Sequence, residues 1–314
     1  MDRIALFGAA GAIGKSIADA LRLRGRAYRV VGRNRHQLEQ AFTNDPLAEI
    51  VTWDPDDPAS IRAAAKDIDT LIYLVGIAYH QFHLHPPAMR RTLEAAIAEG
   101  VKRIVLIGNV YPYGLPSTPT VSEEHPRNPH TFKGKMRMEQ EDILLQAHAA
   151  GKIQATVLRL PDFYGPGVEA SYLHSLFKAA ANGGTADMVG PIDRPHEFVF
   201  VPDVGPVVLD LAETPAAYGR FWNFSGAGSI TQREIATKAF AMTGRKPKIR
   251  IIGKTLLRLI GIFKPFMREM VEMHYLFTTP LLLDDRALVK LLGNVKKTPY
   301  AEGIKLSVDT ERTR

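Results

Sequence analysis

The sequence predicts a doubly wound α/β fold, in which helices cover both faces of a parallel sheet, with a smaller lobe at the C-terminal end. Two observations lead to this fold class. Over residues 1–165, short apolar segments alternate with alanine-rich segments of helical spacing, which is the pattern of repeated strand–helix–strand units. The first apolar segment also ends in a glycine-rich turn that leads directly into a helix.

The apolar segments are the predicted strands, because strands that are covered on both faces are largely free of polar residues. They are Arg3–Phe7, Arg29–Val31, Glu49–Thr52, Thr70–Val75, Arg103–Ile107 and Ala155–Leu160. The predicted helices between them are Gly14–Arg24, Arg35–Phe42, Ala59–Lys66, Ala88–Glu99 and Met136–Ala150. Strands that alternate with helices in this way favour a parallel sheet.

After Gly165 the pattern is less regular, and glycine and proline become frequent. Helices are predicted at Tyr172–Asn182 and Gln232–Thr243. The chain is therefore expected to form a sheet domain over residues 1–165 and a lobe over residues 166–314, interleaved with the end of the sheet. A late segment, Lys254–Phe277, is amphipathic; it is interpreted first as core packing, then as a hydrophobic pocket or lid, and last as a membrane-surface helix, because Gly261 and Pro265 would break a continuous helix.

The composition excludes several kinds of chemistry and location. The 314 residues include no cysteine, which excludes disulfides, thiolate nucleophiles and zinc–thiolate sites. No apolar run reaches the roughly 18 residues that a membrane span requires. The first residues also lack the pattern of a signal peptide. We therefore expect a cytoplasmic protein with no integral membrane segment.

The net charge of +7 comes from 40 basic and 33 acidic residues. The basic residues form only short clusters, at Arg22–Arg35 and Arg245–Lys254, and no long basic block is present. We therefore expect no nucleic-acid partner, and interpret the charge as a solvated surface together with a pocket for a phosphorylated cofactor.

The glycine-rich turn contains Gly8, Gly11 and Gly14 with the spacing GxxGxxG. Glycine lets the chain turn sharply, lets the backbone approach a pyrophosphate, and lets the helix pack close to the strand. The N-terminus of the following helix presents free N–H groups to the phosphates. The turn therefore predicts a dinucleotide site, with Ala10, Ala12 and Ile13 completing its lining.

The second predicted strand ends without the acidic residue that usually accepts a hydrogen bond from the ribose of NAD(H). Arg33 stands at that place, followed by Asn34 and Arg35, and an arginine can pair with a 2′-phosphate. NADP(H) is therefore favoured, with NAD(H) as the alternative. Asp54, after the third strand, is expected either to contact the adenine or to cap a turn.

These residues resemble the short-chain dehydrogenase/reductase superfamily, in particular its extended and atypical branch, the NAD-dependent epimerase/dehydratase family. The likeness extends over most of the chain, in the order Leu74–Gly76, Arg103–Gly114, Lys135–Gln140, Leu158–Gly167, Phe198–Val204 and Trp222–Gly226. The resemblance implies a Rossmann sheet with a C-terminal substrate lobe. It also implies that Val75, Gly76, Pro161 and Phe163 lie beside the nicotinamide half of the cofactor.

In that family a Ser or Thr and a Tyr-x-x-x-Lys pair carry out the proton chemistry, and this sequence departs from the pattern. The resemblance places Asn109 at the serine position, Thr131 at the tyrosine position and Lys135 at the lysine position. Lys135 would hold the ribose and assist proton transfer, and Asn109 would orient a substrate oxygen. The remaining candidates for the acid, on nearby loops, are Tyr111, Tyr113, Tyr164 and His130.

The sequence therefore favours an NADP(H)-dependent oxidoreductase that acts on a small carbonyl or hydroxyl compound. One alternative is a nucleotide-sugar epimerase or dehydratase, and another is a redox sensor that binds NADP(H) without turnover. His80, His83 and His85 are interpreted as part of a loop at the rim of the pocket, and no metal is expected. The expected partner is a small-molecule substrate, and a homodimer is compatible with the sequence.

Overall fold

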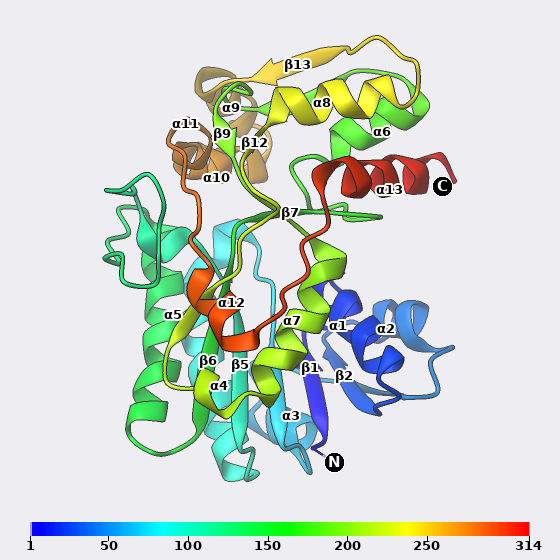
Figure 1. Cartoon of the computed structure of the whole chain (residues 1–314). Helices are drawn as coiled ribbons and strands as arrows, with labels where there is room; N and C mark the ends of the chain where they lie inside the picture. The colour runs from blue at the N-terminus through cyan, green and yellow to red at the C-terminus, as the bar shows by residue number, and fades with distance from the viewer. Residues whose placement is uncertain (1, 314) are drawn as a thin grey trace.

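The computed structural model describes residues 2–313, apart from the side chains of residues 265 and 266. Its centre is a seven-stranded sheet in the order β11-β6-β5-β4-β1-β2-β3, in which every neighbouring pair is parallel (Figure 1). The strand order reverses between β1 and β4, so the fold is doubly wound as predicted. The strands are β1 (Ile4–Phe7), β2 (Tyr28–Gly32), β3 (Ala48–Thr52), β4 (Thr70–Tyr73), β5 (Arg103–Asn109), β6 (Gln154–Leu160) and β11 (Phe221–Asn223).

Helices cover both faces of this sheet. One face carries α1 (Ala12–Leu23), α2 (Arg35–Phe42), α7 (Val201–Glu213) and α12 (Arg286–Leu292). The other carries α3 (Pro58–Ala65), α4 (His85–Ala98) and α5 (Phe132–Ala149). Side chains of β1 alternate between the two cores, since Ile4 and Leu6 pack on the first face and Ala5 and Phe7 on the second. All four are fully buried, which explains why the strand is apolar throughout.

The smaller lobe lies beyond the carboxyl ends of the strands (Figure 1). Its helices α6 (His174–Asn182), α8 (Gln232–Ala241) and α13 (Tyr300–Arg312) share one apolar core. Three two-stranded sheets complete it: β7 (Asp162–Tyr164) with β10 (Phe198–Phe200), β9 (Pro195–His196) with β12 (Ile230–Thr231), and β8 (Ala186–Val189) with β13 (Ile249–Ile252). Between these lobe elements, α7 and β11 return to the central sheet.

The late amphipathic segment forms three short helices: α9 (Lys254–Gly261), α10 (Pro265–Met273) and α11 (Tyr275–Thr278). The predicted break is confirmed, since α9 ends at Gly261 and α10 begins at Pro265. A Cβ on Gly261 would lie 2.8 Å from the Cα of Arg268, so glycine allows the two helices to pack closely. Within residues 2–313, no helix combines the length and the hydrophobicity of a membrane span.

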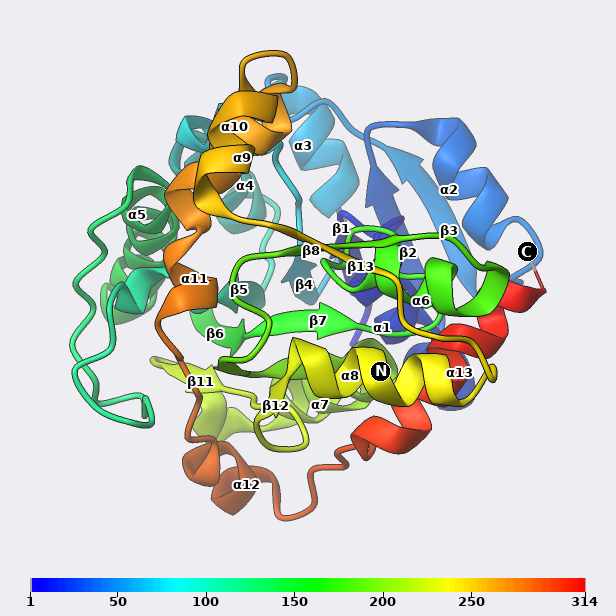
Figure 2. The ribbon, with the colours of Figure 1, turned by 90° about the horizontal axis from the view of Figure 1, so that it is seen from above.

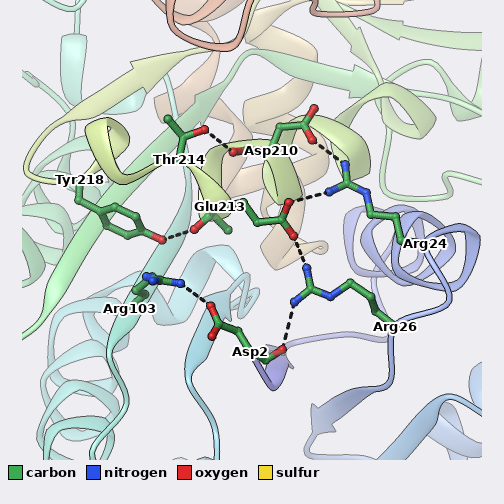
Figure 3. A network of polar contacts seen from close by, with 9 residues as sticks. Asp2, Arg24, Arg26, Arg103, Asp210, Glu213, Thr214 and Tyr218 are labelled. Atoms are coloured by element: carbon green, nitrogen blue, oxygen red, sulfur yellow. Dashed lines mark hydrogen bonds and ion pairs between the residues drawn. The ribbon is translucent and has the colours of Figure 1, made fainter.

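The amino ends of the strands carry a network of charged residues that ties α1 to α7 (Figure 3). Arg24, after α1, contacts Asp210 at 2.6 Å and Glu213 at 3.2 Å, and both acids belong to α7. Arg26 pairs with Glu213 and donates to the Asp2 carbonyl, while the Asp2 carboxylate contacts Arg103 at the start of β5. The side chains of the network are partly exposed, from 13% for Arg26 to 46% for Glu213, so each ion pair adds little stability and the network mainly fixes the position of α7.

Between residues 2 and 313, three short 3-10 helices occur in the connections. They are η1 (Tyr79–Leu84), η2 (Tyr111–Tyr113) and η3 (Pro215–Ala217). The first two follow the carboxyl ends of β4 and β5, on the side of the sheet that faces the lobe. They therefore bring Tyr79 and Tyr111 to the edge where a doubly wound sheet binds its ligands.

Candidate functional site

A cavity of about 1430 Å³ opens at the carboxyl ends of β1, β2, β4, β5 and β6. It brings together most of the predicted cofactor residues, from segments far apart in the sequence. These are Gly8, Ala10, Gly11, Ala12, Ile13, Arg33, Asn34, Arg35, Val75, Gly76, Pro161 and Phe163, and the predicted catalytic residues Asn109 and Tyr111 line it as well. Seven predicted cofactor or catalytic residues do not line it: Gly14, Asp54, Tyr113, His130, Thr131, Lys135 and Tyr164.

The glycine turn has the geometry of a phosphate cradle. Gly8 has a φ of +99°, and a Cβ there would lie 2.7 Å from the Leu74 carbonyl oxygen. Gly14 does not line the cavity; a Cβ on it would lie 2.3 Å from the Ala9 oxygen, so it allows α1 to pack on the turn. A Cβ on Gly11 would meet only the Gly8 oxygen, at 3.8 Å. The backbone at Gly11 is therefore open to a ligand in the cavity.

The N-terminus of α1 points at the same place. No side chain caps it, and its first turn contains no acidic residue. The first N–H groups of a helix lack partners within the helix and carry a partial positive charge. A pyrophosphate therefore fits the residues that are present.

The end of β2 presents one cation that is free to meet a ligand. Arg33 is exposed, lines the cavity, and forms no ion pair with any residue between 2 and 313. Arg35 is held by Glu39 at 2.7 Å, and the Asn34 side chain accepts from the Gln37 N–H to cap α2. Asp54 lies outside the cavity lining; its Oδ1 accepts from the Asp56 N–H at 2.9 Å, so it caps a turn, the second of its two interpretations.

The helix α5 presents Arg137 to the cavity, where the sequence analysis expected Lys135. Lys135 is exposed and does not line the cavity. Residues two apart on an α-helix lie about 200° apart around its axis, so the two side chains lie on opposite faces of α5. The structure therefore turns Arg137, and not Lys135, toward the cavity.

Arg137 is buried and held in place from two sides. Its Nη2 donates to the Ile107 carbonyl at 2.9 Å, and its Nη1 lies 3.3 Å from His85 Nδ1. Burial, together with the nearby Arg137 charge, lowers the pKa of His85 to about 2. His85 is therefore neutral and accepts a hydrogen bond from Arg137. Burial also lowers the pKa of Arg137 from its ordinary value.

Lys133 stands four residues before Arg137, which is the spacing that the resembling family gives to its tyrosine and lysine. It is buried, and its Nζ lies 2.6 Å from Glu269 Oε2 and 2.5 Å from Glu272 Oε2, both on α10. The hydrogen bond from Lys133 keeps the pKa of Glu269 below its ordinary value. Thr131 instead caps α5, since its Oγ1 accepts from the Gly134 N–H at 3.0 Å.

Three tyrosines form a hydrogen-bonded chain at the end of the cavity that lies over β4 and β5. The hydroxyl of Tyr79 lies 2.8 Å from that of Tyr111 and 2.9 Å from that of Tyr172, and all three residues line the cavity. Burial raises the pKa of each above the ordinary value, and those of Tyr111 and Tyr172 well above it. These phenols are therefore neutral hydrogen-bond donors at physiological pH.

Three of the predicted acid candidates lie elsewhere. Tyr113 is buried and donates to Asn223 Oδ1 at 2.7 Å. Tyr164 packs in the core of the lobe, stacked on Tyr300 with ring centres 5.8 Å apart. His130 packs edge-on against Tyr275 and lines a second, smaller hollow. Their loops are close to the site in sequence, but apolar packing directs these side chains away from the cavity.

Two polar groups beside the tyrosines complete this end of the cavity. Asn109 lines it, and its Oδ1 accepts from the Tyr111 N–H at 3.1 Å. Asp162 also lines it, with its Oδ2 2.7 Å from His196 Nε2. Sequence reasoning missed Asp162 and Arg137 as residues of this cavity. Among residues 2–313, no three histidine, aspartate or glutamate side chains are grouped as metal ligands.

This chain is similar to known proteins in both sequence and fold. A model described as the NAD dependent epimerase/dehydratase family matches residues 4–224. The uncharacterized protein y4nL of Sinorhizobium fredii is 25% identical, with 98% of this chain and 94% of that protein covered. The dTDP-6-deoxy-L-talose 4-dehydrogenase (NAD(P)(+)) of Kitasatospora kifunensis is 26% identical, with 68% of this chain and 71% of that protein covered.

Among solved structures, DesIV, a dTDP-glucose 4,6-dehydratase from Streptomyces venezuelae with NAD bound, superposes with a TM-score of 0.83 at 18% identity. That alignment covers 99% of this chain and 97% of the other, so the two share the fold over their whole length. The family model spans more than two thirds of the chain, including the glycine turn and all seven strands of the central sheet. By this match the chain belongs to the NAD-dependent epimerase/dehydratase family.

Proposed function

We propose that this protein is an NADP(H)-dependent oxidoreductase that acts on a small carbonyl or hydroxyl compound. The observation that carries the proposal is Arg33, a guanidinium without an ion pair among the described residues, at the place where NAD-binding sites carry an acid. It lies on the same cavity as the glycine turn and the α1 N-terminus. Membership of a family of dehydrogenases, epimerases and dehydratases supports the class of chemistry.

The residues that would hold the cofactor divide the cavity into two halves. The glycine turn would hold the pyrophosphate, and Arg33 the 2′-phosphate, on the β2 side of β1. The nicotinamide half would then extend to the other side of β1, over β4 and β5, beside Val75, Gly76 and Pro161. Arg137 would donate a hydrogen bond to the nicotinamide ribose. When bound there, the nicotinamide donates or accepts the hydride of the reaction.

Asn109 and Tyr111 are the residues that we assign to the substrate oxygen. The Asn109 Oδ1 already accepts from the Tyr111 N–H, so its NH₂ group is left as the donor. In the reducing direction, this amide would stabilise the oxygen as negative charge develops. The Tyr111 hydroxyl would give its proton to the alkoxide and take one from the Tyr79 hydroxyl, at 2.8 Å. Tyr79 would recover its proton from solvent in the open cavity, through the Tyr172 hydroxyl at 2.9 Å.

The charge distribution favours a small substrate over a nucleotide sugar. The cationic side chains among the described lining residues are Arg33, Arg35 and Arg137. The first two lie at the β2 end, and the third is buried against His85. The opposite end carries phenols, Asn109 and the Asp162 carboxylate, which would repel a diphosphate. A reaction on a nucleotide sugar is the weaker alternative, and the likeness to a dTDP-6-deoxy-L-talose 4-dehydrogenase supports it.

A second candidate function is a redox sensor that binds NADP(H) without turnover. The observation that favours it is Lys133, which occupies the position four residues before Arg137 and is paired with two glutamates. Lys133 does not line the cavity and its Nζ is engaged by both carboxylates, so it is not placed to give a proton to a substrate there. The two candidates differ in hydride transfer: the sensor binds NADPH but oxidises it with no carbonyl compound, whereas the oxidoreductase consumes it.

Replacing Arg33 with alanine is expected to weaken NADPH binding about ten- to a hundredfold, the effect of losing charged hydrogen bonds worth roughly 1.5–3 kcal/mol. NADH binding should change less than about twofold, because NADH lacks the 2′-phosphate. Calorimetric titration of each variant with both cofactors measures this. Arg35→Ala is the matched control, since Arg35 is already engaged by Glu39. Equal losses for NADPH and NADH in Arg33→Ala would contradict the assignment of Arg33.

A further inference from the structure

The positive charge of this chain is concentrated in one segment. Residues 245–268 contain eight lysines and arginines and no acidic residue. The rest of the chain has 32 basic and 33 acidic residues, so it is close to neutral. The net charge of the protein therefore derives from this segment, which forms β13, α9 and the start of α10.

The same segment exposes large apolar side chains. Ile262 and Phe263, between α9 and α10, are 72% and 85% exposed, and Leu259 on α9 is 58% exposed. The opposite face of α9 packs against the lobe, since Leu257 is buried against Met270 and other apolar residues. The exposed residues are therefore additional to those that fold the helix, and they have no role in the core.

The exposed apolar and basic residues lie together at one projecting corner. We call it the α9–α10 tip and define it by Leu256, Leu259, Ile262, Phe263, Lys254, Arg258, Lys264 and Arg268, all of which are exposed. Figure 2 shows the connection between α9 and α10 projecting from the outer edge of the molecule. Lys254 and Arg258 are one helical turn apart on α9, and Lys264 directly follows the apolar pair.

We propose that the α9–α10 tip docks on the surface of an anionic lipid bilayer. Exposed apolar side chains bordered by lysine and arginine are what an interfacial site requires, because the apolar groups enter the headgroup region while the cations meet lipid phosphates and carboxylates. A nucleic acid would pair with the cations but leaves Ile262 and Phe263 without a role. The inference does not depend on the cofactor or the substrate.

The orientation of the docked protein follows from the contacts of α10. Tyr172, which lines the large cavity, contacts the sulfur of Met270 at 3.6 Å, and Lys133 of α5 is tied to Glu269 and Glu272. The tip is therefore attached to the helix that borders the substrate end of the cavity. Docking would place this end next to the bilayer and the sheet domain away from it.

The test is co-sedimentation of the full chain with vesicles of phosphatidylcholine, alone or with about 30 mol% phosphatidylserine. We expect binding at least about tenfold stronger to the anionic vesicles, and weaker binding as salt is raised. The double variant Ile262→Ser/Phe263→Ser and the variant Lys264→Glu/Arg268→Glu should each lose most of it. Leu23→Ser is the matched control, because Leu23 is an apolar residue that is 87% exposed on α1, away from the tip.

Thermal melts check that each variant is folded, which is expected because the substituted side chains are exposed. Equal sedimentation with both vesicle types would overturn the proposal, as would unchanged binding in the Ile262→Ser/Phe263→Ser variant. Sedimentation velocity without lipid tests whether the tip instead contacts a second copy of the chain. Self-association of the wild type that this double variant abolishes, without binding to anionic vesicles, would assign the tip to a second copy of the chain instead.

Discussion

Replacing Glu141 with glutamine is expected to lower the free energy of unfolding by about 3–5 kcal/mol, the cost of removing one partner of a buried ion pair. Glu141 on α5 and Arg159 on β6 are both fully buried, and Arg159 Nε donates to Glu141 Oε1 at 3.1 Å. The guanidinium lies 3.6 Å from the ring centre of Phe221 and 4.4 Å from that of Tyr113. Water cannot replace the lost charge in this enclosure, so Arg159 would remain buried without its counter-ion.

Unfolding in urea, followed by circular dichroism, measures the effect. Glutamine keeps the shape of the side chain, so a loss of stability reports the charge rather than a cavity. Glu139→Gln is the matched control, because Glu139 lies on the exposed side of the same helix and should change stability by less than about 0.5 kcal/mol. If the two variants unfold at the same urea concentration, the ion pair does not hold α5 to the sheet.

The sheet and the cofactor half of the site could be predicted because their signals are local. A strand whose side chains enter two cores must be apolar throughout, as Ile4–Phe7 is. Such an apolar run can be recognised in the sequence. The turn after this strand combines glycine spacing with a strand before it and a helix after it. Arg33 follows from its place at the end of the next strand. Each of these inferences depends on residues adjacent in the chain.

The catalytic half could not be predicted in the same way, because it depends on helix phase and on tertiary contacts. The resemblance places Lys135 at the lysine position, but α5 presents Arg137 to the cavity. Tyr172 reaches Tyr79 across 93 positions of sequence, and His196 reaches Asp162 across 34. A single sequence contains no sign of such pairs, since their side chains meet only after the lobe has packed.

Arg137→Met is expected to weaken NADPH binding at least about tenfold, because a charged hydrogen bond to a bound group contributes roughly 1.5–3 kcal/mol. Methionine approximates the length of the arginine stem but cannot donate to the nicotinamide ribose. For a carbonyl substrate that the wild type reduces, kcat should fall as well, because the ribose then no longer fixes the nicotinamide near Asn109 and Tyr111. Nicotinamide fluorescence and steady-state kinetics measure the two effects separately.

Lys135→Met is the matched control, on the same helix and two residues away. Because Lys135 is exposed on the face of α5 that turns away from the cavity, it should bind NADPH and turn over as the wild type does. The opposite result, with Lys135→Met impaired and Arg137→Met normal, would restore the assignment made from the sequence. Arg137→Lys adds a finer distinction: a lysine retains the charge but not the planar fork that meets both Ile107 and His85, so we expect intermediate affinity. Full recovery with lysine would mean that only the charge at position 137 is required, and that its two buried hydrogen bonds do not orient it for the ribose.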